Sequence, residues 1–216
     1  MALARGDVLL GSERRAMRHG HGEVLLPMIA AVMGPIPPAE IEIVATTVGP
    51  GGFTGIRVGL AAAQGIALAA GARTIGVTSF AAVAAQLAID RDRPVLVTID
   101  SRRRDLYVQL FAAAREPVEP GIAIVPEELP AYIAGLIGNA PLLVAGDAID
   151  AAAAALAGRF GIDFAPASAS GAVGVLAAVR SVWHSGAEPE LPSPLYLRSP
   201  DVTVPEHRAA AASRVK

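Results

Sequence analysis

One almost uncharged segment constrains the fold of this chain more than any other: Gly49 to Gly65, which reads "GPGGFTGIRVGLAAAQG". Glycines and a proline open it, and the residues that follow predict a helix from Thr54 to about Ala70. Arg57 is the only charged residue of that helix. A helix that is apolar on every side has to be buried on every side. We therefore expect one face to lie on a sheet and the other to be covered by this chain's own helix at 20–34, by another chain, or by both.

The glycines of this segment have two interpretations, phosphate binding and close packing. A P-loop requires Gly-Lys-Ser/Thr, whereas this run continues Gly55-Ile56-Arg57, and Thr54 stands where a dinucleotide loop has its third glycine. Backbone N–H groups at the helix start, helped by Arg57, could still bind an anion. The packing interpretation is better supported because a strip of mostly small residues lies in one helical sector and permits close approach of a second helix. These residues are Gly55, Gly59, Ala62, Ala63, Ile66 and Ala70.

Composition narrows the class of protein. The chain has 216 residues, of which 53% are hydrophobic and 18% charged, as in a globular protein of one large domain or two small lobes. It has no cysteine, which excludes disulfides and thiolate metal sites. A net charge of −2 gives no support for direct nucleic-acid binding. The most apolar run, 58–72, is shorter than the roughly 20 residues of a membrane span, and no secretory signal is recognisable. We expect a cytoplasmic protein without a membrane segment.

Strand and helix patterns alternate along the whole chain, which predicts the α/β class. Strands are expected at 7–15, 41–51 and 73–80, and helices at 20–34, 54–70 and 79–90, with Ser79 as a helix cap. A three-stranded meander at 93–125 is expected to precede a helix at 126–138, a strand at 140–150, and helices at 151–161 and 170–186. We interpret these as two related lobes, 1–92 and 93–200, followed by a flexible tail at 201–216. The first lobe begins abruptly and is expected to lack its opening strand.

Few residues are arranged for catalysis. His19, His21 and Glu23 could supply metal ligands, but their spacing matches no known metal motif, and alternation with glycine is typical of a flexible loop. Asp100 ends a predicted strand, a position that can hold Mg²⁺ or phosphate. The alternative is a charged turn in which the arginines at 102–104 neutralise Asp100 and Asp105, and this alternative is favoured. Gly146 is a single glycine, too few for a confident nucleotide loop, and no Ser/His/Asp set can be assembled.

Several segments together resemble one protein family. They are "HGEVLLPMI" (21–29), "VGPGGFTGIRVGLAAAQGIA" (48–67), "IGVTSF" (75–80), "IDSRRRDLY" (99–107) and "PLYLR" (194–198). In this order they resemble the signature segments of the TsaB (YeaZ) family, most specifically between Gly49 and Gly65. The resemblance implies an actin-like ATPase (ASKHA) fold of two RNase H-like lobes. Against the family pattern, the first strand and the phosphate loop are expected to be absent, consistent with a start codon assigned too far downstream. An open sheet edge would be the consequence.

The resemblance also implies a function. TsaB is a non-catalytic subunit, a pseudo-enzyme that binds and activates TsaD for threonylcarbamoyl transfer to the adenosine beside the anticodon of tRNA. TsaE is an ATPase of the same complex, and TsaC supplies the threonylcarbamoyl-adenylate. We therefore expect a TsaD-like partner, contact with a TsaE-like protein through the complex, indirect contact with tRNA, no cofactor and no metal. Self-association is expected when TsaD is missing. The alternative is an ATP-binding phosphotransferase or a metallopeptidase-like enzyme of the same fold.

The resemblance assigns the TsaD contact to the first two helices of the first lobe. The predicted partner interface comprises His21, Leu25, Met28, Ile29, Gly52, Phe53, Thr54, Gly55, Arg57, Gly59, Ala62, Ala63 and Ile66. Asp100 and Gly146 are the candidates for a vestigial nucleotide site.

Overall fold

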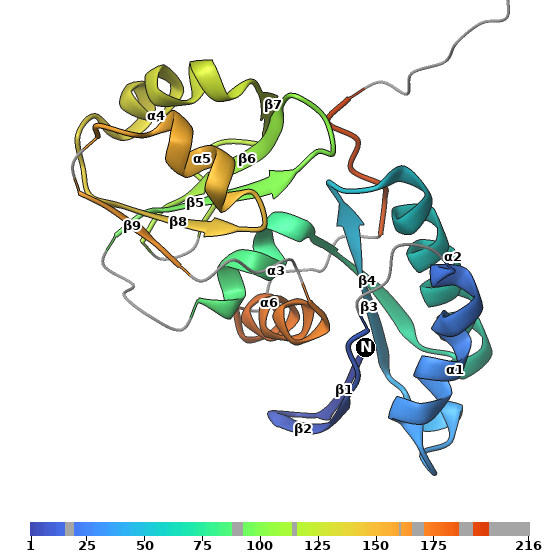
Figure 1. The fold of residues 1–216 in the computed structure, drawn as a ribbon. Coiled ribbons are helices and arrows are strands. Elements are labelled where there is room, and N and C mark those ends of the chain that lie inside the picture. The colour runs from blue at the N-terminus through green and yellow to red at the C-terminus, as the bar shows by residue number, and fades with distance from the viewer. Residues whose placement is uncertain are drawn as a thin grey trace, which may run out of the picture.

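The computed structural model describes residues 1–15, 20–87, 93–113, 116–159, 161–165, 171–185 and 192–198. The first half of the chain forms β1 (Ala2–Arg5), β2 (Val8–Ser12), α1 (His21–Met33), the short 3-10 helix η1 (Pro38–Glu40), β3 (Ile43–Gly49), α2 (Phe53–Ala70), β4 (Arg73–Thr78) and α3 (Ser79–Gln86). The second half forms β5 (Val95–Asp100), β6 (Leu106–Phe111), β7 (Ile122–Ile124), η2 (Pro126–Glu128), α4 (Leu129–Ile137), β8 (Leu142–Gly146), α5 (Ile149–Ala155), β9 (Ile162–Phe164) and α6 (Ala172–Ser185). The expected α/β class is confirmed, and Figure 1 shows the arrangement of these elements.

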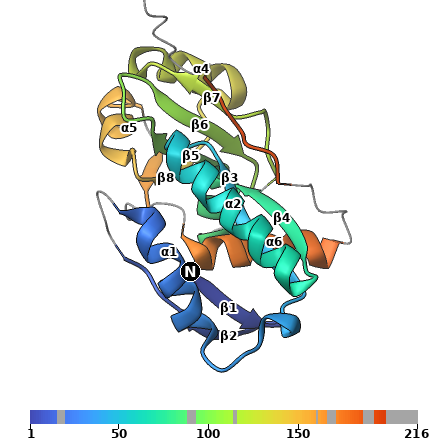
Figure 2. The same ribbon diagram turned by 90° about the vertical axis from the view of Figure 1, so that its right-hand side faces the viewer.

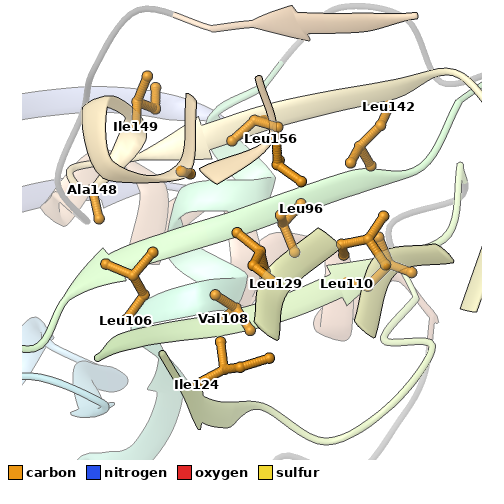
Figure 3. Packing of buried hydrophobic residues seen from close by; sticks show 13 residues of the cluster. Leu96, Leu106, Val108, Leu110, Ile124, Leu129, Leu142, Ala148, Ile149 and Leu156 are labelled. Carbon is orange, nitrogen blue, oxygen red and sulfur yellow. The ribbon is translucent and has the colours of Figure 1, made fainter. Parts of the chain in front are cut away.

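The second half is built on a five-stranded sheet in the order β7-β6-β5-β8-β9. β5, β6 and β7 are antiparallel, as the predicted meander requires, whereas β8 and β9 run parallel to β5. Side chains of a strand alternate between the two faces of its sheet. Leu96 and Leu142 therefore join the core beneath α4 and α5, which Figure 3 shows, while Val95 and Val97 pack on the opposite face with Phe80 of α3.

Helices α3 and α6 lie between the large sheet and the strands of the first half (Figure 1). Val175 and Val179 of α6 form a buried cluster with Ile75 and Val77 of β4 and with Ala82 of α3. The last helix that the structure describes thus packs against elements of the first half. The division into lobes at 92/93 stays a prediction.

The first half contains two separate two-stranded sheets, an antiparallel β1–β2 hairpin and a parallel β3–β4 pair. In the described residues β1 pairs with β2 alone and β3 with β4 alone, so the expected open strand edge is present. Helix α2 packs along β3. α1 and α2 both lie on the outer side of these strands, which is the face turned toward the viewer in Figure 2.

The predicted helices and most predicted strands are confirmed, with differences of a few residues at their ends. Two strands were not predicted as such: β1, within the first five residues, and β9, which is only three residues long. The predicted tail at 201–216 lies outside the described residues.

One local prediction was wrong. Thr78, not Ser79, caps α3, since its side-chain oxygen accepts a hydrogen bond of 3.0 Å from the N–H of Ala81. Helix α1 begins at His21, so Pro27 lies in its second turn. α1 continues through it although a proline there removes one backbone hydrogen bond.

Candidate partner-binding surface

The glycine segment makes a close turn where β3 meets α2. Gly49 has a φ of +113°, and a Cβ atom there would lie 2.6 Å from the carbonyl oxygen of Leu195 and 2.9 Å from Cδ1 of Ile56. The N–H of Leu195 donates a 2.8 Å hydrogen bond to the carbonyl of Val48. Only glycine has both the conformational freedom and the small volume for this position. The glycine at 49 therefore serves close packing, with a segment from the far end of the chain.

One stripe of α2 is buried. Ile56, Leu60, Ala63 and Ala67 recur at helical spacing and face the strands. Of the predicted small-residue strip, Ala63 belongs to this buried stripe, whereas Gly59, Ala62, Ile66 and Ala70 are half-buried at its side and Gly55 is exposed.

Much of the rest of α2 is exposed although most of its residues are apolar. Leu68 is 86% exposed, and a Cβ atom added at Gly55 or Gly65 would meet nothing within 4 Å. Within the described chain the strands cover one face of this helix and Leu68 is left exposed, so burial on every side stays a prediction that depends on another chain. An exposed, contiguous apolar helix face is typical of a binding surface.

Helix α1 adds to this exposed surface. None of its described side chains is fully buried, and Leu26 is 62% exposed. Leu25, Met28 and Ile29 of the predicted interface are half-buried, and α1 contacts β1 and β2. The outer sides of α1 and α2 together form what we call the α1–α2 surface (Figure 2).

An aromatic cluster lies at the start of α2. The guanidinium carbon of Arg57 lies 3.7 Å from the ring centroid of Phe53, and its Nε donates a 3.1 Å hydrogen bond to the hydroxyl of Tyr196. The two rings are 5.3 Å apart, and Phe53 and Tyr196 remain 42% and 40% exposed. Sequence reasoning identified Phe53 and Arg57 but missed Tyr196; the "PLYLR" segment was its only signal. Partly exposed Arg and Tyr side chains held in place are the residue types that dominate protein interfaces.

The histidine motif does not form the expected loop. His21, Gly22 and Glu23 form the first turn of α1, and His19 lies outside the described residues. Where the structure gives side chains, no group of three His, Cys, Asp or Glu residues is placed to hold a metal ion.

Asp100 and Gly146 lie at the carboxyl ends of neighbouring strands. The carboxylate of Asp100 accepts a hydrogen bond of 2.7 Å from the N–H of Arg102 and pairs with its guanidinium at 3.2 Å. The N–H of Asp100 donates to Oδ1 of Asp147 at 2.9 Å. Asp100 thus lies in the charged turn that the sequence favoured.

Close packing between two strands explains why residue 146 is a glycine. Its φ is +120°, and a Cβ atom there would lie 1.8 Å from the carbonyl oxygen of Thr98. No side chain fits between β5 and β8 at this point.

The carboxylate of Asp105 was expected to pair with the turn arginines, and this is wrong: its partner is Arg198, whose Nε lies 2.9 Å from Oδ2.

By length and composition alone, α2 could span a membrane. In the structure it is one layer of an α/β domain, with a buried stripe on β3.

Comparison with known proteins adds evidence from relatives. Residues 14–128 match the family model described as TsaD, tRNA N6-adenosine threonylcarbamoyltransferase. An uncharacterised protein of Mycobacterium tuberculosis is 30% identical over 196 residues, which are 90% of this chain and 82% of that protein. The tRNA threonylcarbamoyladenosine biosynthesis protein TsaB of Buchnera aphidicola is 44% identical over 57 residues, 26% of each chain. Among solved structures, YeaZ from Pseudomonas aeruginosa superposes with a TM-score of 0.72 at 22% identity, covering 91% of this chain and 92% of its own.

Proposed function

Because this chain belongs to the TsaB (YeaZ) family and has its actin-like ASKHA fold, we propose that it is a non-catalytic subunit of tRNA threonylcarbamoyladenosine synthesis. In this proposal it binds a TsaD-like catalytic subunit and holds it in the active arrangement. A TsaE-like ATPase joins through the complex, and tRNA contacts the catalytic partner.

The α1–α2 surface carries this proposal. Gly55 and Gly65 are open, and Leu68 is almost fully exposed, so these three residues of α2 do not serve packing within the described chain. A helix face with glycines lets another helix approach closely and bury the exposed Leu68. Arg57, which stacks on Phe53 and donates a hydrogen bond to Tyr196, adds a pre-ordered anchor at one end of this face.

Co-expression with the TsaD of the same genome tests the proposal. We expect the two proteins to co-purify as a heterodimer, and the pair, with the other components, to form threonylcarbamoyladenosine on tRNA. The chain alone is expected to form a homodimer through the same surface, which the partner displaces. Absence of a complex with TsaD, or full activity of TsaD without this chain, would overturn the proposal.

The variant Leu68→Glu tests whether the contact with TsaD lies on the α1–α2 surface. A buried charge without a partner is costly at an interface, so this variant is expected to lose TsaD binding, whereas its free energy of unfolding stays within about 0.5 kcal/mol of the native value because residue 68 is exposed. Val118→Glu is the matched control, since Val118 is a 41% exposed apolar residue of the second half. Equal binding by both variants would place the contact elsewhere.

The enzyme alternative has a separate test. Titration of the isolated chain with ATP and Mg²⁺ is expected to give no tight binding. Tight binding lost in Asp100→Ala would instead support a nucleotide site at the ends of β5 and β8. In keeping with the subunit role, we place the protein in the cytoplasm.

A further inference from the structure

Tyr196 is held against the start of α2 by the residues on both sides of it. Leu195 packs with Val48 and Ile56 in a small buried cluster and donates its N–H to the carbonyl of Val48 at 2.8 Å. Leu197 packs on the core that α3 shares with the large sheet. Leu195 and Leu197 are half-buried, whereas Tyr196 is 40% exposed. The fold therefore fixes the position of this tyrosine ring and leaves the ring accessible from outside.

Two contacts with aromatic residues orient the side chain of Arg57. Phe53 lies one turn earlier in α2, and its ring centroid is 3.7 Å from the guanidinium carbon, which makes this a cation–π contact. Nε donates a 3.1 Å hydrogen bond to the hydroxyl of Tyr196. The guanidinium group is thus held by one face and by Nε, and its terminal nitrogens Nη1 and Nη2 are left for another acceptor.

Arg57 has no anionic partner in the part of the chain that the structure describes. Its side chain donates to the Tyr196 hydroxyl alone, and no described carboxylate forms an ion pair with it. Glu23 is the one acidic residue of helices α1 and α2, and it is exposed. Arg104 and Arg198, in contrast, each pair with a carboxylate. The positive charge of Arg57 is therefore not neutralised within the described fold.

A partner that covers the α1–α2 surface removes water from around Arg57. The loss of hydration makes a guanidinium group without an anionic partner costly. The cost is offset when the partner supplies an anion in good geometry. Nη1 and Nη2 form a planar fork that matches the two oxygens of a carboxylate.

On the premise of the proposed function, we propose that Arg57 binds a carboxylate side chain of the TsaD-like partner, an aspartate or a glutamate on the helix that packs on α2. Hydrogen bonds from Nη1 and Nη2 hold the two carboxylate oxygens. Tyr196 is a positioning residue in this contact, because its hydroxyl fixes the direction of the fork. A carboxylate fits better than a phosphorylated residue, since proteins bind phosphorylated partners with clusters of arginines and Arg57 is the only charged residue of α2.

Binding of purified TsaD to variants of the full chain tests the role of Arg57. Arg57→Gln removes the charge and the fork, and it is expected to raise the Kd for TsaD at least about tenfold, because the carboxylate of TsaD is then buried without its partner. Arg57→Lys keeps the charge but loses both the fork and the stacking on Phe53. Its Kd is expected to lie between those of the native chain and Arg57→Gln.

Arg104→Gln is the matched control. It makes the same chemical change at an arginine of the second half whose side chain is 79% exposed, and its Kd for TsaD is expected to stay within about twofold of the native value. Because Arg57 and Arg104 are both exposed, the urea midpoint of each variant is expected to equal that of the native chain.

Tyr196→Phe separates positioning from packing. The variant keeps the ring and removes only the hydroxyl that accepts the hydrogen bond from Nε of Arg57. It is expected to raise the Kd of the native chain about threefold or more, and to have no effect in the Arg57→Gln chain, where no fork is left to orient. An equal loss in both backgrounds would show that Tyr196 does not act through Arg57.

Substitutions in TsaD identify the carboxylate itself. Each aspartate and glutamate of the surface helices of TsaD is replaced in turn by asparagine or glutamine. One replacement is expected to weaken binding to the native chain about tenfold and to cause no further loss with Arg57→Gln. If no replacement is coupled to Arg57 in this way, the anion is not a side chain of TsaD and the inference is wrong.

A native Kd for Arg57→Gln or for Arg57→Lys would also overturn the inference. If Leu68→Glu still loses TsaD binding in that case, the proposed subunit role stands and only the contact at Arg57 is wrong. If the native chain itself does not bind TsaD, the proposed function and the contact at Arg57 are both wrong.

Discussion

Arg198 reaches back to Asp105, with its Nε 2.9 Å from Oδ2 of a side chain that is only 4% exposed. Asp105 also accepts a 3.0 Å hydrogen bond from the hydroxyl of Ser101. Three residues before Arg198, Leu195 is hydrogen-bonded to the end of β3. The segment 192–198 therefore connects β3 with the turn that follows β5.

Arg198→Ala is expected to lower the free energy of unfolding by about 1–3 kcal/mol, because a buried carboxylate loses its charged partner. Urea unfolding measures the change. The control is Arg5→Ala, which breaks a pair whose side chains are 71% and 51% exposed and should cost at most about 1 kcal/mol. Similar losses in both variants would show that the Arg198 contact adds nothing beyond a surface pair.

Gly65→Leu tests close helix approach on the partner surface. The position is helical and open, so we expect the monomer to remain folded and to gain up to about 1 kcal/mol from helix propensity, whereas TsaD binding is lost because a branched side chain holds the partner helix away. Gly135→Leu changes an equally open glycine of α4 and should leave binding intact. Pull-down measures TsaD binding by both variants, and circular dichroism checks that they are folded. Unchanged capture of TsaD by Gly65→Leu would contradict the expectation.

Gly146→Ala is expected to prevent stable folding or to cost more than about 3 kcal/mol, because the new Cβ atom would lie 1.8 Å from the Thr98 carbonyl in a left-handed backbone conformation. Gly135→Ala serves as the comparison and should stabilise α4 by up to about 1 kcal/mol. Thermal unfolding of the two variants measures the difference in their stability. A melting temperature of Gly146→Ala close to native would show that β5 and β8 can separate at low cost.

Tyr132 gives a prediction for alkaline pH. Burial raises the pKa of its hydroxyl above the ordinary value, and the negative charge of Glu119 adds to this. The folded state then holds the phenolic proton more tightly than the unfolded state, so this contribution to stability is complete below the unfolded pKa of about 10 and is lost as the pH rises through the raised pKa.

Tyr132→Phe removes this dependence. Because the buried hydroxyl has no hydrogen-bond partner among the described residues, the variant is expected to be at least as stable as the native chain at pH 7 and to unfold at a higher alkaline pH. Stability measured across the alkaline range checks both points. A loss of about 1 kcal/mol or more at pH 7 would indicate that the hydroxyl is bonded after all.

Local sequence patterns were sufficient for much of this fold. The apolar runs of β5 and β6 have the length of strands, and the long, almost uncharged run of α2 has the length of a helix, so each pattern identifies its element. β9 has only three residues, too few for a pattern to show. Thr78 and Ser79 are both good caps, and sequence alone cannot choose between neighbours.

The candidate site was only partly predictable for a different reason. The small residues of α2 were visible in the sequence, but which of them face β3 depends on how the helix is rotated in the fold. Arg57 and Tyr196 are 139 positions apart, and no local pattern relates such residues. The same holds for Arg198 and Asp105, whose pairing replaced the expected one with the turn arginines.

The contacts of Gly49 and Gly76 with the segment 192–198 have a consequence for folding during synthesis on the ribosome. Leu195 closes over Gly49, and Cα of Pro192 would lie 2.9 Å from a Cβ atom at Gly76. Both contacts join β3 and β4 to residues that are translated only after the whole five-stranded sheet. The ribosome therefore exposes β3 and β4 until this covering segment emerges, and these strands are a part of the molecule that a nascent-chain chaperone would have to protect.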